Sequence, residues 1–314
     1  MVVGIGDDMA VLEVGGEKIL ITTDMLLEGV HFTLSDEHAY AAHKHATLKQ
    51  VGYKAMACSL SDCAAMAARP WVAVAAVALP QSMSMEEAQE LHRGLQRAGQ
   101  KYHCPLVGGD TTSWDKPLAI NVTMLAKAQG TEPVLRSGAQ VGDAIMVTGE
   151  LGGSRAGKHL NFEPRVAEAC KLARMAELHA MIDISDGLSI DLDHICQESK
   201  VGAVIDAAAV PVSAAAQQGV EPLEAALSDG EDFELLFCVR QEDAEKLLRE
   251  WPKQSAVKLS RIGEIVEIDD NRRGENMLTR CVSMPPGQNS GRLFIRDEKG
   301  QIKPLAVKGW EHFK

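Results

Sequence analysis

Small residues followed by aspartates recur along this chain at the ends of apolar stretches. The first example is Gly4-Ile5-Gly6-Asp7-Asp8, in which two adjacent carboxylates follow glycines that permit a tight turn. The pattern returns in residues 19–24, 58–62, 106–112 and 181–187. A single aspartate after a strand is usually a turn residue or a helix cap. Because adjacent carboxylates repel each other unless a cation lies between them, the five sites together predict one acidic centre that holds divalent metal and phosphate.

The oxygen atoms of this acidic set are the kind that magnesium prefers as ligands. Carboxylates come from Asp8, Asp24, Asp62, Asp110 and Asp183, and hydroxyls from Thr22, Thr23 and Ser185. Magnesium ions at such a site neutralise charge on phosphate oxygens and align the attacking group. The set contains no covalent nucleophile. The residues alone therefore predict metal-assisted phosphate chemistry, and they leave kinase and hydrolase as open alternatives.

The bulk composition limits the class of protein. A chain of 314 residues with 46% hydrophobic and 24% charged residues is long enough for two ordinary globular domains. Its formal net charge of -12 argues against nucleic acid as a partner, because nucleic-acid binding rests on a basic surface. We expect no membrane partner, since no apolar run approaches the ~20 residues of a membrane span. Seven cysteines without a Cys-x-x-Cys pair are typical of reduced thiols, so a cytoplasmic location is expected.

The elements that must position the acidic set alternate between strands and helices. In the first half, apolar runs predict strands at residues 2–5, 10–14, 18–23, 72–79, 106–107 and 118–128. A capping-box pattern at residues 84–87 predicts a helix that runs to about Tyr102. The alanine-rich stretch 39–68 predicts two helices, broken near Val51-Gly52 or within residues 59–62. This order indicates an α/β domain that ends near Gly130.

The second half repeats the alternation. Strands are predicted at residues 144–148, 181–182, 203–205, 234–239, 262–268 and 291–295, and helices at residues 166–179, 188–199, 221–227 and 241–250. Residues 152–158 have the Gly-x4-Gly-Lys spacing of a phosphate loop, but His159 stands where that motif needs a Ser or Thr for magnesium. The favoured interpretation is a glycine-rich turn over residues 149–157 that packs a following helix onto a strand.

Several of these stretches, in this order, resemble the thiamine-monophosphate kinase family of the aminoimidazole ribonucleotide synthetase-like superfamily. The motifs are Gly4-Ile5-Gly6-Asp7-Asp8, Thr22-Thr23-Asp24-Met25-Leu26 through Gly29-Val30-His31-Phe32, Leu60-Ser61-Asp62, Gly108-Gly109-Asp110-Thr111-Thr112, Asp183-Ile184-Ser185-Asp186-Gly187-Leu188 and Gly230-Glu231-Asp232-Phe233-Glu234-Leu235. The resemblance runs from Gly4 to Phe313 and implies a two-domain α/β (α+β) fold. It implies an N-terminal domain, residues 1–130, with a mixed sheet that binds ATP and metal and joins a homodimer. Residues 131–314 would form a C-terminal α/β domain that completes the substrate site.

The resemblance implies transfer of the ATP γ-phosphoryl group to thiamine monophosphate, giving thiamine diphosphate. The magnesium ligands it implies are Asp8, Thr22, Thr23, Asp24, Asp62, Asp110, Asp183 and Asp186, of which Asp24, Asp62 and Asp110 would be catalytic. Contacts to ATP would come from Gly109, Asp110, Arg136 and Ser185, and contacts to the thiamine end from His31, Glu231 and Trp310. Each of the last three also has a structural alternative: a loop histidine, a helix cap and a residue closing the C-terminal core.

Three further functions stay open alongside this one. A metal-dependent phosphohydrolase would use the same carboxylates with water as the acceptor, and another enzyme of the superfamily would act on a different phosphorylated acceptor. A nucleotide-binding regulator without turnover is the third possibility. It is least favoured, because a sensor does not need several metal ligands.

Overall fold

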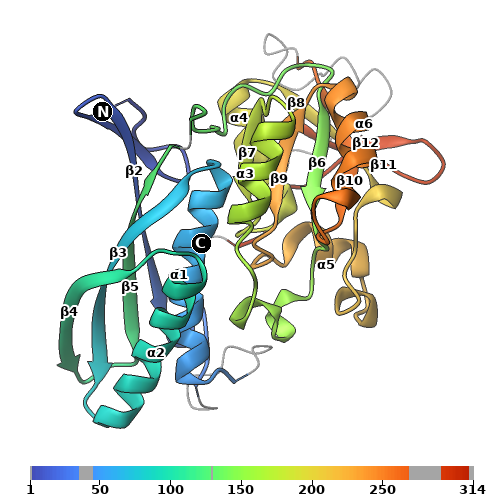
Figure 1. Ribbon diagram of the computed structural model, residues 1–314. Coiled ribbons are helices and arrows are strands. Elements are labelled where there is room, and N and C mark those ends of the chain that lie inside the picture. Colours follow the sequence, from blue (N-terminus) through green and yellow to red (C-terminus); the bar gives the residue numbers. More distant parts are fainter. Residues whose placement is uncertain (1, 35–44, 129, 269–290, 311–314) are drawn as a thin grey trace. The chain divides into compact units, whose positions relative to one another are not determined.

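The computed structural model describes residues 2–34, 45–128, 130–268 and 291–310 (Figure 1). Contacts divide the chain into two units, the first made of Met1–Pro133 with Arg155–Cys170 and the second of Val134–Ser154 with Lys171–Lys314. The chain therefore returns to the first unit for a short segment after it has entered the second. Among the described helices none is long and apolar enough to cross a membrane.

The first unit is built on a five-stranded sheet with the strand order β1-β2-β5-β3-β4. Its strands are β1 (Ala10–Val14), β2 (Glu17–Leu27), β3 (Arg69–Pro80), β4 (Leu106–Trp114) and β5 (Ala119–Lys127). Gly15 and Gly16, with φ of 60° and 83°, form the turn that joins β1 to β2. The β3–β4 pair is parallel and the other pairs are antiparallel, because α2 (Met85–Lys101) connects β3 to β4 as a crossover.

Helices α1 (Leu48–Ala65) and α2 pack against each other, and α1 covers one face of this sheet (Figure 1). The capping box predicted at Ser84 and Glu87 is confirmed, and Thr47 with Gln50 forms a second one at the start of α1. The predicted break in the alanine-rich stretch is wrong for the described part, since α1 runs unbroken through both candidate positions. Gly52 is a contact point between helices: a Cβ there would lie 3.1 Å from the Cα of Gly94 on α2.

Gly52→Ala should therefore destabilise the protein, although alanine is the better helix former by about 1 kcal/mol. The new Cβ would lie 2.0 Å from the carbonyl oxygen of Leu91, so the two helices must move apart. We expect the free energy of unfolding to fall by about 2 kcal/mol in urea denaturation. Gly108→Ala is the control, because its Cβ would meet only a Val74 methyl at 3.9 Å; equal stability of the two variants would contradict the packing argument.

Among the described residues, none covers the other face of the five-stranded sheet, which is open to solvent. Side chains alternate between faces along each strand, so Met25, Asn121, Ala76 and Asp110 form one row across four strands on the open face. Met25 is 58% exposed and Val74, in the neighbouring row, is 41% exposed. Two apolar side chains on this uncovered face therefore lie in water.

The second unit contains a seven-stranded sheet with the order β12-β11-β8-β10-β6-β9-β7. Its strands are β6 (Ala144–Thr148), β7 (Ala180–Asp183), β8 (Gly202–Asp206), β9 (Leu235–Val239), β10 (Leu259–Val266), β11 (Leu293–Arg296) and β12 (Ile302–Pro304). Helices α4 (Leu188–Ser199) and α5 (Pro222–Ser228) share one apolar core with this sheet. Helix α6 (Gln241–Glu250) belongs to the same unit, whereas α3 (Val166–Met175) begins in the first unit and ends in the second. The mixed sheet confirms the predicted α+β character.

Most predicted elements of the second half are confirmed, although β10 begins three residues before its predicted start and three larger differences occur. The third helix ends at Met175, because the main-chain N–H of His179 already donates to the carbonyl oxygen of Cys238 in β9, so His179 belongs to the approach to β7. After the glycine-rich stretch the chain forms two short 3-10 turns, Ser154–Ala156 and Lys158–Leu160, in place of the predicted helix. Strand β12 was not predicted.

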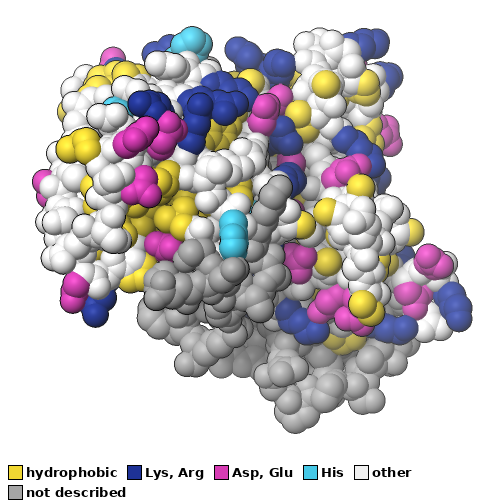
Figure 2. All heavy atoms as spheres, turned by 90° about the horizontal axis from the view of Figure 1, so that it is seen from below, with side chains coloured by type: hydrophobic (Ala, Val, Ile, Leu, Met, Phe, Trp, Pro, Cys, Tyr) yellow, Lys and Arg dark blue, Asp and Glu magenta, His cyan; other side chains and the backbone are white. Residues whose placement is uncertain are grey.

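On the face of the molecule in Figure 2, acidic and basic side chains both occur, and neither sign covers the face alone.

Candidate metal and phosphate site

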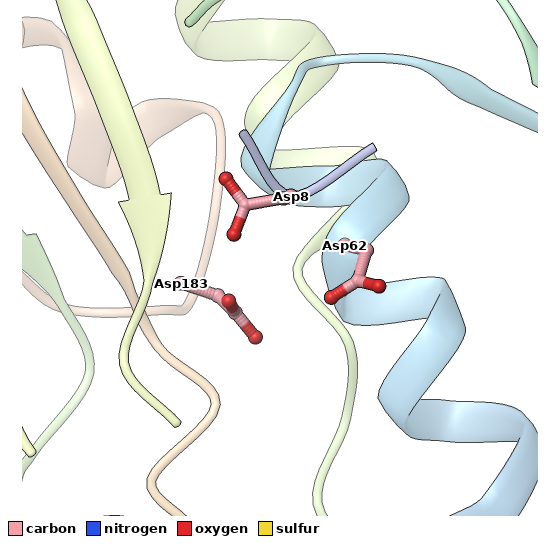
Figure 3. A group of neighbouring side chains, drawn as sticks. All are labelled: Asp8, Asp62 and Asp183. Carbon is pink, nitrogen blue, oxygen red and sulfur yellow. The ribbon is translucent and has the colours of Figure 1, made fainter. Parts of the chain in front are cut away.

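Two aspartates from separate parts of the first unit come together. Asp8 lies in the loop before β1, and Asp62 lies in the last turn of α1. Each offers a carboxylate oxygen within 4.8 Å of the other (Figure 3). The Thr22 hydroxyl, on the covered face of β2, donates a hydrogen bond to Asp62. Two carboxylates and a hydroxyl form a set of hard oxygen donors, which suits magnesium.

Asp24 lies on the same covered face of β2, two residues beyond Thr22. The Ser59 hydroxyl of α1 donates to its carboxylate at 2.5 Å. Burial raises the pKa of Asp24, the Ser59 hydrogen bond lowers it, and the negative charge of Asp8 raises it further. The net pKa is above the ordinary value, so the ionised form of Asp24 is disfavoured without a cation. A bound metal ion would offset that effect.

Two residues predicted to bind metal, Thr23 and Asp110, do not join the donor set of Asp8, Asp62 and Asp24 in the described part of the chain. Thr23 points to the open face, where its hydroxyl lies 2.9 Å from that of Thr123. Asp110 is exposed on the edge strand β4 and shares a row with Met25 of the open face. The two-residue alternation of a strand separates Thr23 from Thr22 and Asp24, a signal already present in the sequence. The metal roles of Thr23 and Asp110 stay predictions.

Gly109 has a structural reason to be glycine. Its φ is +153°, and a Cβ there would lie 1.8 Å from the carbonyl oxygen of Ala75 on β3. The glycine therefore allows β4 to pair closely with β3. The predicted contact of Gly109 with ATP would be a second role, in addition to this packing role.

In the second unit, the proposed metal residues lie on one short turn. Asp183 is buried at the end of β7, and Ser185 and Asp186 follow it before α4 begins. One carboxylate oxygen of Asp191, Oδ2, accepts hydrogen bonds from the N–H groups of Asp186 at 3.1 Å and Gly187 at 3.0 Å. Burial raises the pKa of Asp191 well above its usual range, and the charges of Asp186 and Asp183 add to that effect. No local sequence pattern indicates this role for Asp191.

The three residues expected at the thiamine end have these surroundings. Glu231 has a positive φ of 60° and donates its N–H to the Ser185 carbonyl at 2.7 Å. The main-chain N–H of Trp310 donates to the Asp186 carbonyl at 3.0 Å. In the first unit, the ring Nδ1 of His31 accepts from the N–H of Leu27 at 3.0 Å. Residues 311–313 of the family resemblance lie outside the described residues.

Arg136, the expected ATP contact of the second unit, is half-buried. Its carbonyl oxygen accepts a hydrogen bond from the Ser199 hydroxyl of α4 at 3.2 Å. The guanidinium fork suits phosphate oxygens, so its predicted role remains chemically sound.

Helix α1 also carries a fully buried lysine, Lys54, whose position the sequence does not predict. The ammonium of Lys54 donates to the His31 carbonyl at 2.6 Å and lies 2.9 Å from Nδ1 of His159. Lysine is rarely buried without partners, so this group fixes both the His31 loop and the 3-10 turn that contains His159. Its partners lie far apart in the sequence, and no local pattern identifies it.

In the glycine-rich stretch between β6 and the 3-10 turns, backbone N–H groups donate hydrogen bonds to carboxylates of the same unit. The N–H of Gly152 donates to both oxygens of Asp232 at 3.0 and 2.9 Å, and the N–H of Gly153 donates to Asp229 at 2.9 Å. A Cβ on Gly152 would lie 2.6 Å from the nitrogen of Ala226 in α5. Backbone donors already bonded to carboxylates are not presented to a phosphate, which supports the packing-turn interpretation over the phosphate loop.

Asp232→Ala should lower the free energy of unfolding by about 3 kcal/mol, because it leaves buried donors without an acceptor. Asp232 is 1% exposed and also accepts from the Ser154 hydroxyl. Asp229→Ala is the matched control: its carboxylate is half-buried and bonds a single backbone N–H of the same loop, so about 1 kcal/mol is expected. Urea denaturation followed by circular dichroism measures both. A larger loss for Asp229→Ala would contradict this account of the loop.

Comparison with known proteins finds matches to one family over most of the length of the chain. The family models for AIR synthase related protein match twice, the N-terminal domain over residues 6–128 and the C-terminal domain over residues 140–273. The thiamine-monophosphate kinase of Rhodopirellula baltica is 42% identical over 278 residues, covering 84% of this chain and 83% of that protein. The thiamine-monophosphate kinase of Escherichia coli is 33% identical over 337 residues, covering 99% of this chain and 91% of that protein.

Solved structures give the same result for the fold. AaThiL complexed with AMPPCP and TMP has a TM-score of 0.77 and 29% identity, with 98% of this chain and 92% of that chain covered. Thiamine-monophosphate kinase from Stenotrophomonas maltophilia has a TM-score of 0.71 and 31% identity, with 85% and 88% covered. Hydrogenase maturation protein HypE, at 18% identity and a TM-score of 0.68, shares the fold alone. The predicted two-domain fold is thereby confirmed, and the chain belongs to the thiamine-monophosphate kinase family.

Proposed function

We propose that this protein transfers the γ-phosphoryl group of ATP to the phosphate of thiamine monophosphate, giving thiamine diphosphate and ADP. The observation that carries the proposal is the pair of carboxylates, Asp8 and Asp62, held together with the Thr22 hydroxyl. Such oxygen donors suit magnesium, and the related AaThiL was solved with AMPPCP and TMP.

Asp8, Asp62 and Asp24 would hold magnesium in the first unit, and Asp183 and Asp186 would hold magnesium in the second unit. Magnesium supplies positive charge that offsets repulsion between the two polyanionic substrates. Arg136, Ser185 and Gly109 would bind ATP, with Asp110 and Thr23 contributing further oxygen atoms. His31, Glu231 and Trp310 would hold the thiamine end. No strong base is needed, because the second ionisation of a phosphate ester has a pKa of about 6.

We also propose a homodimer that joins through the open face of the five-stranded sheet. The support is the exposure of Met25 and Val74 on that face, next to the exposed edge strand β4. Apolar side chains gathered on an uncovered face are typical of interfaces. Light scattering at micromolar protein is expected to give the dimer mass, and a monomer would contradict this assembly without affecting the fold. The cytoplasmic location stays a prediction.

An acceptor assay tests the proposed reaction. Purified protein with ATP, magnesium and thiamine monophosphate should form ADP and thiamine diphosphate in equal amounts. ADP formed at the same rate without thiamine monophosphate would instead support the phosphohydrolase. Tight ATP binding without product would support the regulator, and ADP formed only with another phosphate ester would assign a different acceptor.

A further inference from the structure

The turn formed by residues 183–187 supports two other segments of the second unit on its main chain. The Ser185 carbonyl accepts the N–H of Glu231 at 2.7 Å, and the Asp186 carbonyl accepts the N–H of Trp310 at 3.0 Å. The turn therefore links residues proposed to bind metal with both residues of this unit proposed to hold the thiamine end.

Both segments lie against the turn without spare room. A Cβ on Gly230 would lie 2.7 Å from the Ser185 carbonyl oxygen, and a Cβ on Gly309 would lie 2.2 Å from the Asp186 carbonyl oxygen. Each segment thus places a glycine directly before the residue that bonds the turn. A shift of the turn must move both neighbours, because closely packed groups transmit displacement.

Asp191 fixes the turn from inside the unit. Asp191 is buried, with 1% of the residue exposed, and its Oδ2 atom accepts hydrogen bonds from the N–H groups of both Asp186 and Gly187. On the same helix, the Ser189 hydroxyl donates to the Lys308 carbonyl at 2.6 Å and accepts the Lys308 N–H at 3.0 Å. The first turn of α4 therefore holds both the metal-bearing turn and the segment that leads to Trp310.

We infer that Asp191 is a positioning residue that couples binding of the phosphoryl acceptor to binding of metal. By fixing the main chain of Asp186 and Gly187, it sets the Asp186 side chain and, through the two carbonyls, the main chain of Glu231 and Trp310. The inference rests on the proposed function for the identity of the acceptor. This positioning role requires a hydrogen-bond acceptor at position 191, because the side chain there bonds the N–H groups of Asp186 and Gly187.

Two substitutions separate this role from that of a metal ligand. Asp191→Asn keeps an acceptor oxygen for both N–H groups and removes the charge, whereas Asp191→Ala removes the acceptor. Asp193→Ala is the matched control: Asp193 is a buried carboxylate of the same helix, but it bonds the Gln197 amide at 2.5 Å and not the turn.

The first measurement needs no ligand. In hydrogen exchange followed by mass spectrometry, Asp191→Ala should speed exchange in residues 183–187, 229–233 and 306–310 together by ~10-fold or more, as loss of a buried hydrogen-bonded network does. Asp191→Asn should stay close to wild type, and Asp193→Ala should leave these three segments unchanged. Faster exchange confined to 183–187 would overturn the coupling.

The second measurement is binding by titration calorimetry, with thiamine monophosphate in the presence of AMPPCP and, separately, with Mn²⁺. Asp191→Ala should weaken both affinities ~10-fold or more, and Asp191→Asn should restore both to within about 3-fold of wild type. If Asp191→Asn is as weak as Asp191→Ala, the charge matters and the positioning role is wrong. If wild type binds Mn²⁺ but not thiamine monophosphate, the proposed acceptor fails, while exchange and Mn²⁺ binding still decide the role of Asp191.

Discussion

Asp62→Asn should lower kcat for thiamine diphosphate formation by ~10²-fold or more, as loss of a preorganised electrostatic partner does. Asp62 lies within reach of Asp8 and accepts the Thr22 hydroxyl, so the substitution removes a charge from the centre of the donor set. Lys158→Ala should keep kcat within a few-fold of wild type. Lys158 begins a short 3-10 turn beyond a loop whose donors already bond carboxylates.

Steady-state kinetics with saturating ATP and thiamine monophosphate gives this comparison. Melting curves for both variants serve as the control, because Asn has nearly the shape of Asp and should leave the fold intact. Loss of activity in Lys158→Ala with near-normal kcat in Asp62→Asn would reverse the assignment and favour the phosphate loop.

Removal of divalent metal should reduce product formation to background. The reacting ends of both substrates are polyanionic, and the chain itself carries a formal net charge of -12, so protein side chains alone do not offset the repulsion. The acidic donors of the first unit would then repel the phosphates as well. An excess of chelator is expected to stop the reaction.

Adding magnesium beyond the chelator should restore the rate, which separates loss of metal from unfolding. Calorimetric titration of Mn²⁺ into wild type and Asp62→Asn gives a readout independent of turnover, and the variant should bind more weakly. Turnover that continues unchanged in chelator would exclude the metal centre proposed here.

The fold was largely predictable because its strands are apolar runs bounded by glycine, proline or aspartate. Strand β6 and helix α6 have the predicted bounds. The break predicted in α1 failed because a glycine in a helix is ambiguous locally: Gly52 serves the contact with Gly94, 42 positions further along the sequence. The motif around Gly109 was expected after a brief strand, yet β4 continues through it to Trp114, since pairing with β3 extends along its whole length.

The site was predictable only where neighbours in sequence share a face. Thr22 and Asp24 lie two apart on one strand and face α1, as the alternation of a strand dictates, whereas Thr23 faces away. Asp191 and Lys54 could not be assigned from sequence, because their roles depend on the main chain they bond. A carboxylate on a helix and a lysine among alanines look like ordinary surface residues until their partners are known.

The most direct test of the central claim follows the phosphoryl group itself. With ATP labelled at the γ-phosphorus, magnesium and thiamine monophosphate, the label should appear in the terminal phosphate of thiamine diphosphate, with one ADP formed for each labelled product. Label released as inorganic phosphate at a rate independent of thiamine monophosphate, with none in thiamine diphosphate, would contradict the account.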